Sequence, residues 1–95
     1  MKNQLNFDDA QQLAINALVF LTEDSELLSR FLALTGIGAD QIRAAASEPG
    51  FLAGVLSFYL GHEPTLLQFC EASGTDPASF QEALLLLPGG RQHEI

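Results

Sequence analysis

The sequence predicts an all-α domain of six short helices, and three observations support that prediction. Apolar residues recur every three or four positions, and no run alternates apolar and polar residues as a half-buried strand would. Glycine or proline ends each apolar run after a length that suits a short helix. Residues 17–46 also align without a gap to residues 55–84, thirty-eight positions later, with six identities among the thirty aligned positions. We therefore interpret the chain as a three-helix unit that occurs twice.

The first predicted helix runs from Asp8 or Asp9 to about Glu23. Asn6 or Asp8 is suited to cap it, because a short polar side chain can accept a hydrogen bond from the free N–H groups of the first turn. Its core-facing stripe has helical spacing and consists of Ala10, Leu13, Ala14, Ala17, Leu18 and Leu21. This stripe is expected to form part of the core.

The second predicted helix begins at Asp24 or Ser25 and ends before Gly36, because glycine adopts the left-handed conformation that closes helices at little cost. Its inward-facing residues are predicted to be Leu27, Leu28, Phe31, Leu32 and Leu34. A short third helix is expected at residues 39–46, with a packed side formed by Ile42, Ala45 and Ala46.

The fourth predicted helix covers residues 49–60, starts at a proline and contains no charged residue, so we expect it to be the most buried. The fifth covers residues 64–73 and is expected to pack through Leu66, Leu67, Phe69 and Cys70. The sixth follows the Asp76-Pro77 cap and is expected to pack through Phe80, Ala83, Leu84 and Leu87.

Length and composition limit the class of protein. The 95 residues predict one domain over residues 1–95, with an ordered core at about 8–89 and a mobile tail at 90–95. The formal net charge of −8 disfavours nucleic acid and anionic lipid surfaces as partners. No basic-then-apolar leader opens the chain, and its longest uncharged apolar stretch, residues 49–61, is too short to cross a bilayer. With a lone Cys70, these features predict a cytoplasmic protein with no membrane partner.

No pattern in the sequence indicates catalysis, a cofactor or a metal. The one cluster of metal-ligand residue types combines His62, Glu63, Cys70 and Glu71, and Pro64 interrupts the helix that would align them. Cys70 has no base that spacing places beside it, and no glycine-rich phosphate loop is present. We therefore expect no cofactor and favour a non-enzymatic role, with an enzyme that uses Cys70 as a weaker alternative.

The turn Gly36-Ile37-Gly38 offers an alternative function. A glycine, a hydrophobic residue and a second glycine between two helices resemble the hairpin of helix-hairpin-helix proteins, whose backbone N–H groups bind a DNA phosphate. Such modules add lysine or arginine after the turn, whereas this chain has Asp40 and only Arg43 nearby. The second copy of the unit has Asp76 in place of Gly38, which favours an ordinary turn between helices.

The chain has more apolar side chains than one small core requires. Leu84 to Leu87 place leucine on every side of the last helix, and Ile15 and Val19 lie a third of a turn outside the stripe of the first. Exposed apolar groups of this kind mark contacts with other proteins. We therefore predict a protein–protein interaction module or a small homodimer, whose contact residues are Ile15, Val19, Leu85 and Leu86.

Several local strings also resemble a known family. They include Arg30-Phe31-Leu32 followed by Thr35-Gly36, Phe51-Leu52-Ala53 followed by Val55-Leu56, and the closing Leu87-Pro88-Gly89. Over about residues 10–90 the chain resembles a small helical family of alphaproteobacteria that is classed as a domain of unknown function. The resemblance implies an all-helical fold and brings no activity, cofactor or catalytic residue.

Overall fold

The computed structural model describes residues 5–48 and 50–89, and in these ranges it contains helices and no strand. The elements are α1 (Phe7–Thr22), α2 (Ser25–Thr35), the 3₁₀ turn η1 (Ala39–Gln41), α3 (Ile42–Ala45), α4 (Phe51–Leu60), α5 (Glu63–Ser73) and α6 (Ala78–Leu86). The predicted all-α class is confirmed. The predicted mobile tail, residues 90–95, lies outside the described residues.

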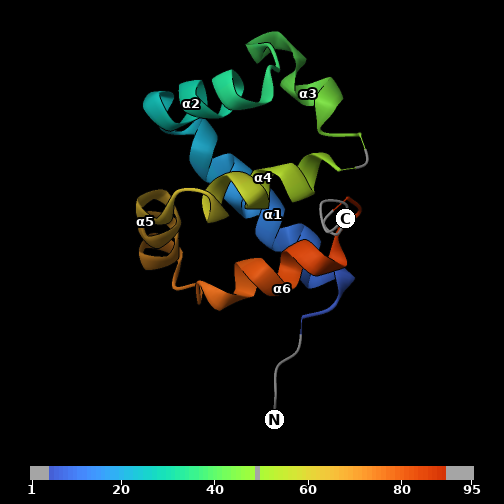
Figure 1. Ribbon diagram of the computed structural model, residues 1–95, viewed down its shortest axis with the longest axis vertical. Helices are drawn as coiled ribbons and strands as arrows, with labels where there is room; N and C mark the ends of the chain where they lie inside the picture. The colour runs from blue at the N-terminus through green and yellow to red at the C-terminus, as the bar shows by residue number, and fades with distance from the viewer. Residues whose placement is uncertain (1–4, 49, 90–95) are drawn as a thin grey trace.

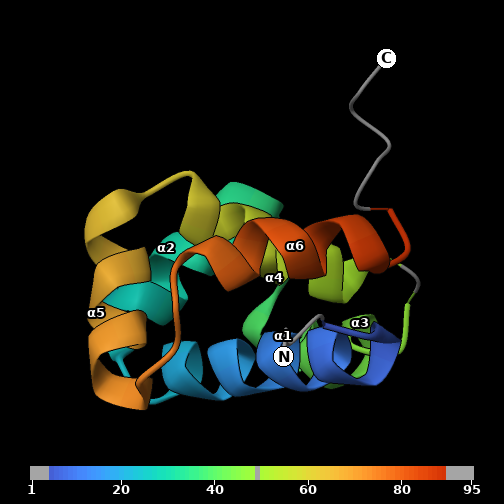
Figure 2. The same ribbon diagram turned by 90° about the horizontal axis from the view of Figure 1, so that it is seen from below.

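Helices α1 and α4 cross at the centre of the molecule (Figure 1). Helices α2 and α3 lie at one end, and α6 lies at the other, where it packs along both α1 and α4. Figure 2 shows that the last turn of α6 lies beside the start of α1. As its lack of charge predicts, α4 is deeply buried, and Val55, Leu56 and Tyr59 are fully shielded from solvent.

Local hydrogen bonds explain where the first two helices begin. The Asn6 side chain accepts from the Asp9 N–H at 2.8 Å, and the Asp9 carboxylate accepts from the Asn6 N–H at 3.2 Å. This reciprocal pair is a capping box, so Asn6 rather than Asp8 is the cap. Asp24 caps α2 by accepting from the N–H groups of Glu26 and Leu27.

Several helix boundaries in the two halves of the chain correspond at the predicted offset of thirty-eight residues. Both ends of α2 and α5 correspond in this way, and so do the last residues of α1 and α4. Gly36 and Gly74, which are also thirty-eight apart, close α2 and α5 in the left-handed conformation, with φ of 77° and 75°.

The aromatic core repeats the same relationship across the two halves. Phe20 packs edge-on against Phe69 with ring centres 5.3 Å apart, and Phe58 packs edge-on against Phe31 at 5.4 Å. Shifting Phe20 and Phe31 by thirty-eight positions gives Phe58 and Phe69, so the offset exchanges the two pairs. Such an exchange is expected of two units related by an approximate two-fold axis. It supports the interpretation of a repeated unit.

Two helix boundaries and three inward positions differ from the prediction. The fourth helix begins at Phe51 because Gly50, with φ of 93°, cannot belong to a right-handed helix. The third starts with the 3₁₀ turn η1, and Ala46 is exposed rather than packed.

Leu34 and Leu67 were both predicted to face inward, and both are exposed, by 71% and 46%. Leu34 lies in the last turn of α2, and α2 packs across the end of α1 (Figure 1), which leaves that turn little to bury against. Leu67 lies about 100° around α5 from the buried Leu66, outside the face through which α5 packs on the core.

Candidate functional site

All four predicted contact residues are exposed. Ile15, Val19, Leu85 and Leu86 keep between 40% and 49% of their surface accessible to solvent. The residues beside them in sequence explain why. The core side of α1 is occupied by its alanine and leucine stripe, and the core side of α6 by Phe80, Ala83 and Leu87. Ile15 and Val19 on α1, and Leu85 and Leu86 on α6, lie outside these core sides and are exposed.

The structure does not gather these four residues into one patch. Ile15 and Val19 lie one turn apart in the second half of α1. Leu85 and Leu86 lie at the end of α6, beside the start of α1 (Figure 2). Val19 is twelve residues after Phe7, the first residue of α1, or about 18 Å along the helix axis. The predicted surface thus consists of two separate apolar patches.

The patch on α6 surrounds a hollow of about 270 Å³, which we call the leucine hollow. It is lined by Leu5, Glu82, Leu85 and Leu86. Three apolar side chains and one carboxylate therefore meet at this surface. Leu5, which precedes α1 and is half-buried, lines this hollow and was absent from the set predicted from the sequence. Its position directly before the Asn6 cap is the signal that could have placed it beside the first turn of α1.

Two further hollows flank the first half of the chain. One, of about 660 Å³, lies between Leu18 of α1 and the η1–α3 segment, including Ile42 and Arg43. The other, of about 180 Å³, lies between Phe7 of α1 and Leu52 of α4. Phe7 is 46% exposed and is a second apolar surface residue absent from the predicted set. Neither hollow contains a pair of groups arranged for acid–base or nucleophilic chemistry.

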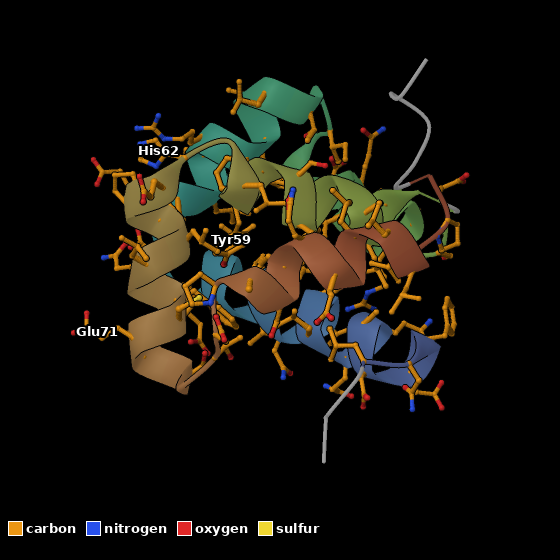
Figure 3. All side chains as sticks on the ribbon, turned by 60° about the horizontal axis from the view of Figure 1, so that its bottom comes forward. Tyr59, His62 and Glu71 are labelled. Carbon is orange, nitrogen blue, oxygen red and sulfur yellow. The ribbon has the colours of Figure 1, made fainter. Side chains whose placement is uncertain are left out.

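The buried titratable groups serve packing. Figure 3 shows Tyr59 between the helices, where its hydroxyl donates to the Ala17 carbonyl at 2.7 Å. Burial, followed by the nearby Cys70 thiolate, raises the pKa of the Tyr59 hydroxyl. Burial, followed by the charge of Asp76, likewise raises the pKa of the Cys70 thiol. A raised pKa keeps the thiol protonated and therefore a weak nucleophile.

The residue types that suit a metal do not converge. Figure 3 places His62 at the start of α5 and Glu71 farther along the same helix, both on its outer side. The His62 ring forms a hydrogen bond through Nδ1 with the Thr65 hydroxyl at 2.7 Å, so this ring nitrogen already has a partner in the protein. Among the described residues, no group of three or more His, Cys, Asp or Glu side chains is arranged to hold a metal ion.

The N–H groups of the turn Gly36-Ile37-Gly38 already have acceptors inside the protein. Gly36 donates to the Leu32 carbonyl at 2.8 Å, Ile37 to the Thr35 hydroxyl at 3.3 Å and Gly38 to the Gln41 side chain at 3.1 Å. A phosphate bound at this turn would have to replace these bonds. The geometry is that of a helix end followed by a short cap.

These features define a small all-α domain with an apolar surface at the junction of α1 and α6. None of the helices in the described ranges combines the length and the apolar character needed to span a membrane. The chain belongs to the family described as protein of unknown function (DUF3572), whose model matches residues 7–90. This match confirms the resemblance to a family of unknown function. A comparison with curated proteins and one with solved structures gave no match.

Proposed function

We propose that this protein is a non-enzymatic protein–protein interaction module that binds through the leucine hollow, with Ile15 and Val19 as a second contact. The observation that supports it is the exposure of Leu85 and Leu86 beside Leu5, on a helix whose other face is fully packed. A monomer gains nothing from two adjacent leucines in water. A partner that covers them removes that apolar surface from solvent.

Nucleic-acid binding through the Gly36 turn receives less support. All three N–H groups of the turn are engaged in the chain, and the described residues hold eleven carboxylates against two arginines. Such a surface repels a phosphate backbone. We propose a cytoplasmic location on the basis of the single, buried and free Cys70.

Site-specific photocross-linking in the producing cell tests the proposed surface. A photoreactive residue at position 86 is expected to give one defined adduct, because Leu86 lies in the contact. Positions 34 and 67 serve as matched controls, since Leu34 and Leu67 are exposed leucines on other helices. Absence of an adduct at positions 15, 19, 85 and 86 alike would contradict the proposal.

A further inference from the structure

The leucine hollow also indicates what kind of partner it accepts, if the proposed function holds. We propose that the partner presents a basic amphipathic helix, with leucine-like side chains between Leu85 and Leu86 and lysine or arginine next to Glu82. The proposal rests on the lining of the hollow, on the distribution of charge over the described residues, and on what a second copy of this chain would meet there.

The lining calls for both an apolar and a cationic group. Leu5, Leu85 and Leu86 supply the apolar walls, and Glu82 supplies one carboxylate at the same hollow. A volume of about 270 Å³ is suited to one or two aliphatic side chains rather than to a folded loop. Side chains one helical turn apart on a partner helix enter such a hollow together, and a basic residue beside them lies opposite Glu82.

Charge is distributed unevenly around the molecule. The two arginines in the described ranges, Arg30 and Arg43, belong to α2 and α3, at the end of the molecule opposite α6 (Figure 1). Asp8 and Asp9 occupy the first turn of α1, and the Asp9 carboxylate bonds the N–H of Asn6, directly after Leu5. The charged groups next to the hollow in the described ranges are therefore negative. Such a surface attracts a basic partner and repels an acidic one.

A second copy of the chain fits this surface poorly. A two-fold contact centred on this hollow brings the same patch of both copies together, so the two Glu82 carboxylates would lie near each other. Each copy also has a formal charge of −8, which adds repulsion at longer range. A partner with positive charge replaces both repulsions by attractions.

Two synthetic helical peptides test the inference on the full-length chain. Both have the same leucine pattern, and their polar positions are lysine in one and glutamate in the other. We expect the lysine peptide to shift the amide resonances of Glu82, Leu85 and Leu86 in ¹⁵N-labelled protein, and the glutamate peptide to shift none. Leu86→Glu is expected to weaken binding of the lysine peptide at least tenfold, whereas Leu67→Glu, on α5, leaves it unchanged.

This pair of variants separates docking from general electrostatic attraction. Each variant adds one negative charge at an exposed leucine, so attraction by net charge alone predicts tighter binding for both. Only insertion of side chains between the leucines predicts weaker binding for Leu86→Glu. Circular dichroism melts establish that both variants are folded. Equal responses of Leu86→Glu and Leu67→Glu would overturn the inference.

The remaining outcomes distinguish the class of partner from the proposed function. Equal binding of both peptides at the hollow would refute a basic partner and leave the interaction surface supported. Self-association that light scattering detects and Leu86→Glu abolishes would assign the hollow to a second copy and also refute it. Failure of both peptides to bind, with no self-association and no photocross-link, would refute the inference and the proposed function together.

Discussion

The two halves of this chain use the same pattern of leucine, phenylalanine and glycine, yet their third helices pack differently. In the second half, α6 lies against α1 and α4, and its Phe80 and Ala83 are fully buried. In the first half, the residues thirty-eight positions earlier are Ile42 and Ala45, and both are only half-buried. A hollow lies between the η1–α3 segment and Leu18 of α1. The repeated pattern thus accounts for the matching helices of the two halves. The two third helices differ in that α6 has Phe80 where α3 has the smaller Ile42.

The largest expected effect tests this difference between the third helices. Phe80→Ala removes a fully buried ring that packs on Tyr59 and Phe69, and we expect a loss of about 3–5 kcal/mol in the free energy of unfolding. Ile42→Ala, at the equivalent position, is expected to cost about 1–2 kcal/mol because Ile42 is only partly buried. Urea unfolding followed by circular dichroism measures both. Equal losses would show that α3 and α6 contribute equally to the core.

A loss of that size approaches the whole stability of a small domain, which is about 5–15 kcal/mol. Phe80→Leu therefore serves as a second variant, since it keeps most of the apolar volume and is expected to lose less than Phe80→Ala. A larger loss for Phe80→Leu than for Phe80→Ala would mean that a change of side-chain shape, rather than a cavity, destabilises the core.

A smaller effect concerns the contact between the two halves. Tyr59 occupies the position equivalent to Leu21, and both are fully buried, but only Tyr59 donates a hydrogen bond across the interface, to the Ala17 carbonyl. Tyr59→Phe removes that bond, and we expect a loss of about 1–2 kcal/mol at pH 8. Urea unfolding of both proteins at pH 8 measures it. Equal stability at that pH would show that the hydroxyl contributes nothing.

Alkaline pH sharpens the Tyr59 experiment. Burial raises the pKa of the hydroxyl in the folded state above its ordinary value of about 10, so above that pH the unfolded chain ionises first and the folded state loses stability. Tyr59→Phe lacks this loss, and its deficit relative to the natural protein should narrow between pH 9 and about pH 11. Tyr59 is the only tyrosine, so phenolate absorbance reports it alone. A deficit that stays constant would contradict the raised pKa.

Sequence periodicity predicted which faces of α1 and α6 are buried, because each of these helices lies against two or more others. It was wrong for Leu34 and Leu67, because periodicity alone does not say how wide the covered face of a peripheral helix such as α2 or α5 is. The exposure of Leu85 and Leu86 followed from four consecutive leucines, since no surface helix buries every side.

The arrangement of the candidate site was less accessible to sequence analysis. Whether Ile15 and Val19 join Leu85 and Leu86 depends on how α6 lies along α1, and no local pattern in either helix contains that information. The same holds for Leu5, which reaches the hollow only because α6 ends beside the start of α1 (Figure 2). The first residue of α4 was also mispredicted. It depends on the left-handed conformation of Gly50, and glycine can adopt several other conformations.

The smallest expected effect concerns the glycines that end α2 and α5, where the two halves have the same conformation. Gly36 and Gly74 both have positive φ, and a Cβ added at either would meet no atom within 4 Å, so alanine is penalised by the backbone alone. We expect Gly36→Ala and Gly74→Ala to destabilise the fold by about 1 kcal/mol each, and by amounts that agree within about 0.5 kcal/mol.

Gly54 is the matched control: a Cβ there also meets nothing within 4 Å, but it lies inside α4 at ordinary helical φ. Alanine at that position should stabilise the protein by about 0.5–1 kcal/mol, because it improves helix propensity. Unequal losses at Gly36 and Gly74 in urea unfolding would mean that the two helix ends share a conformation but not the same packing around it.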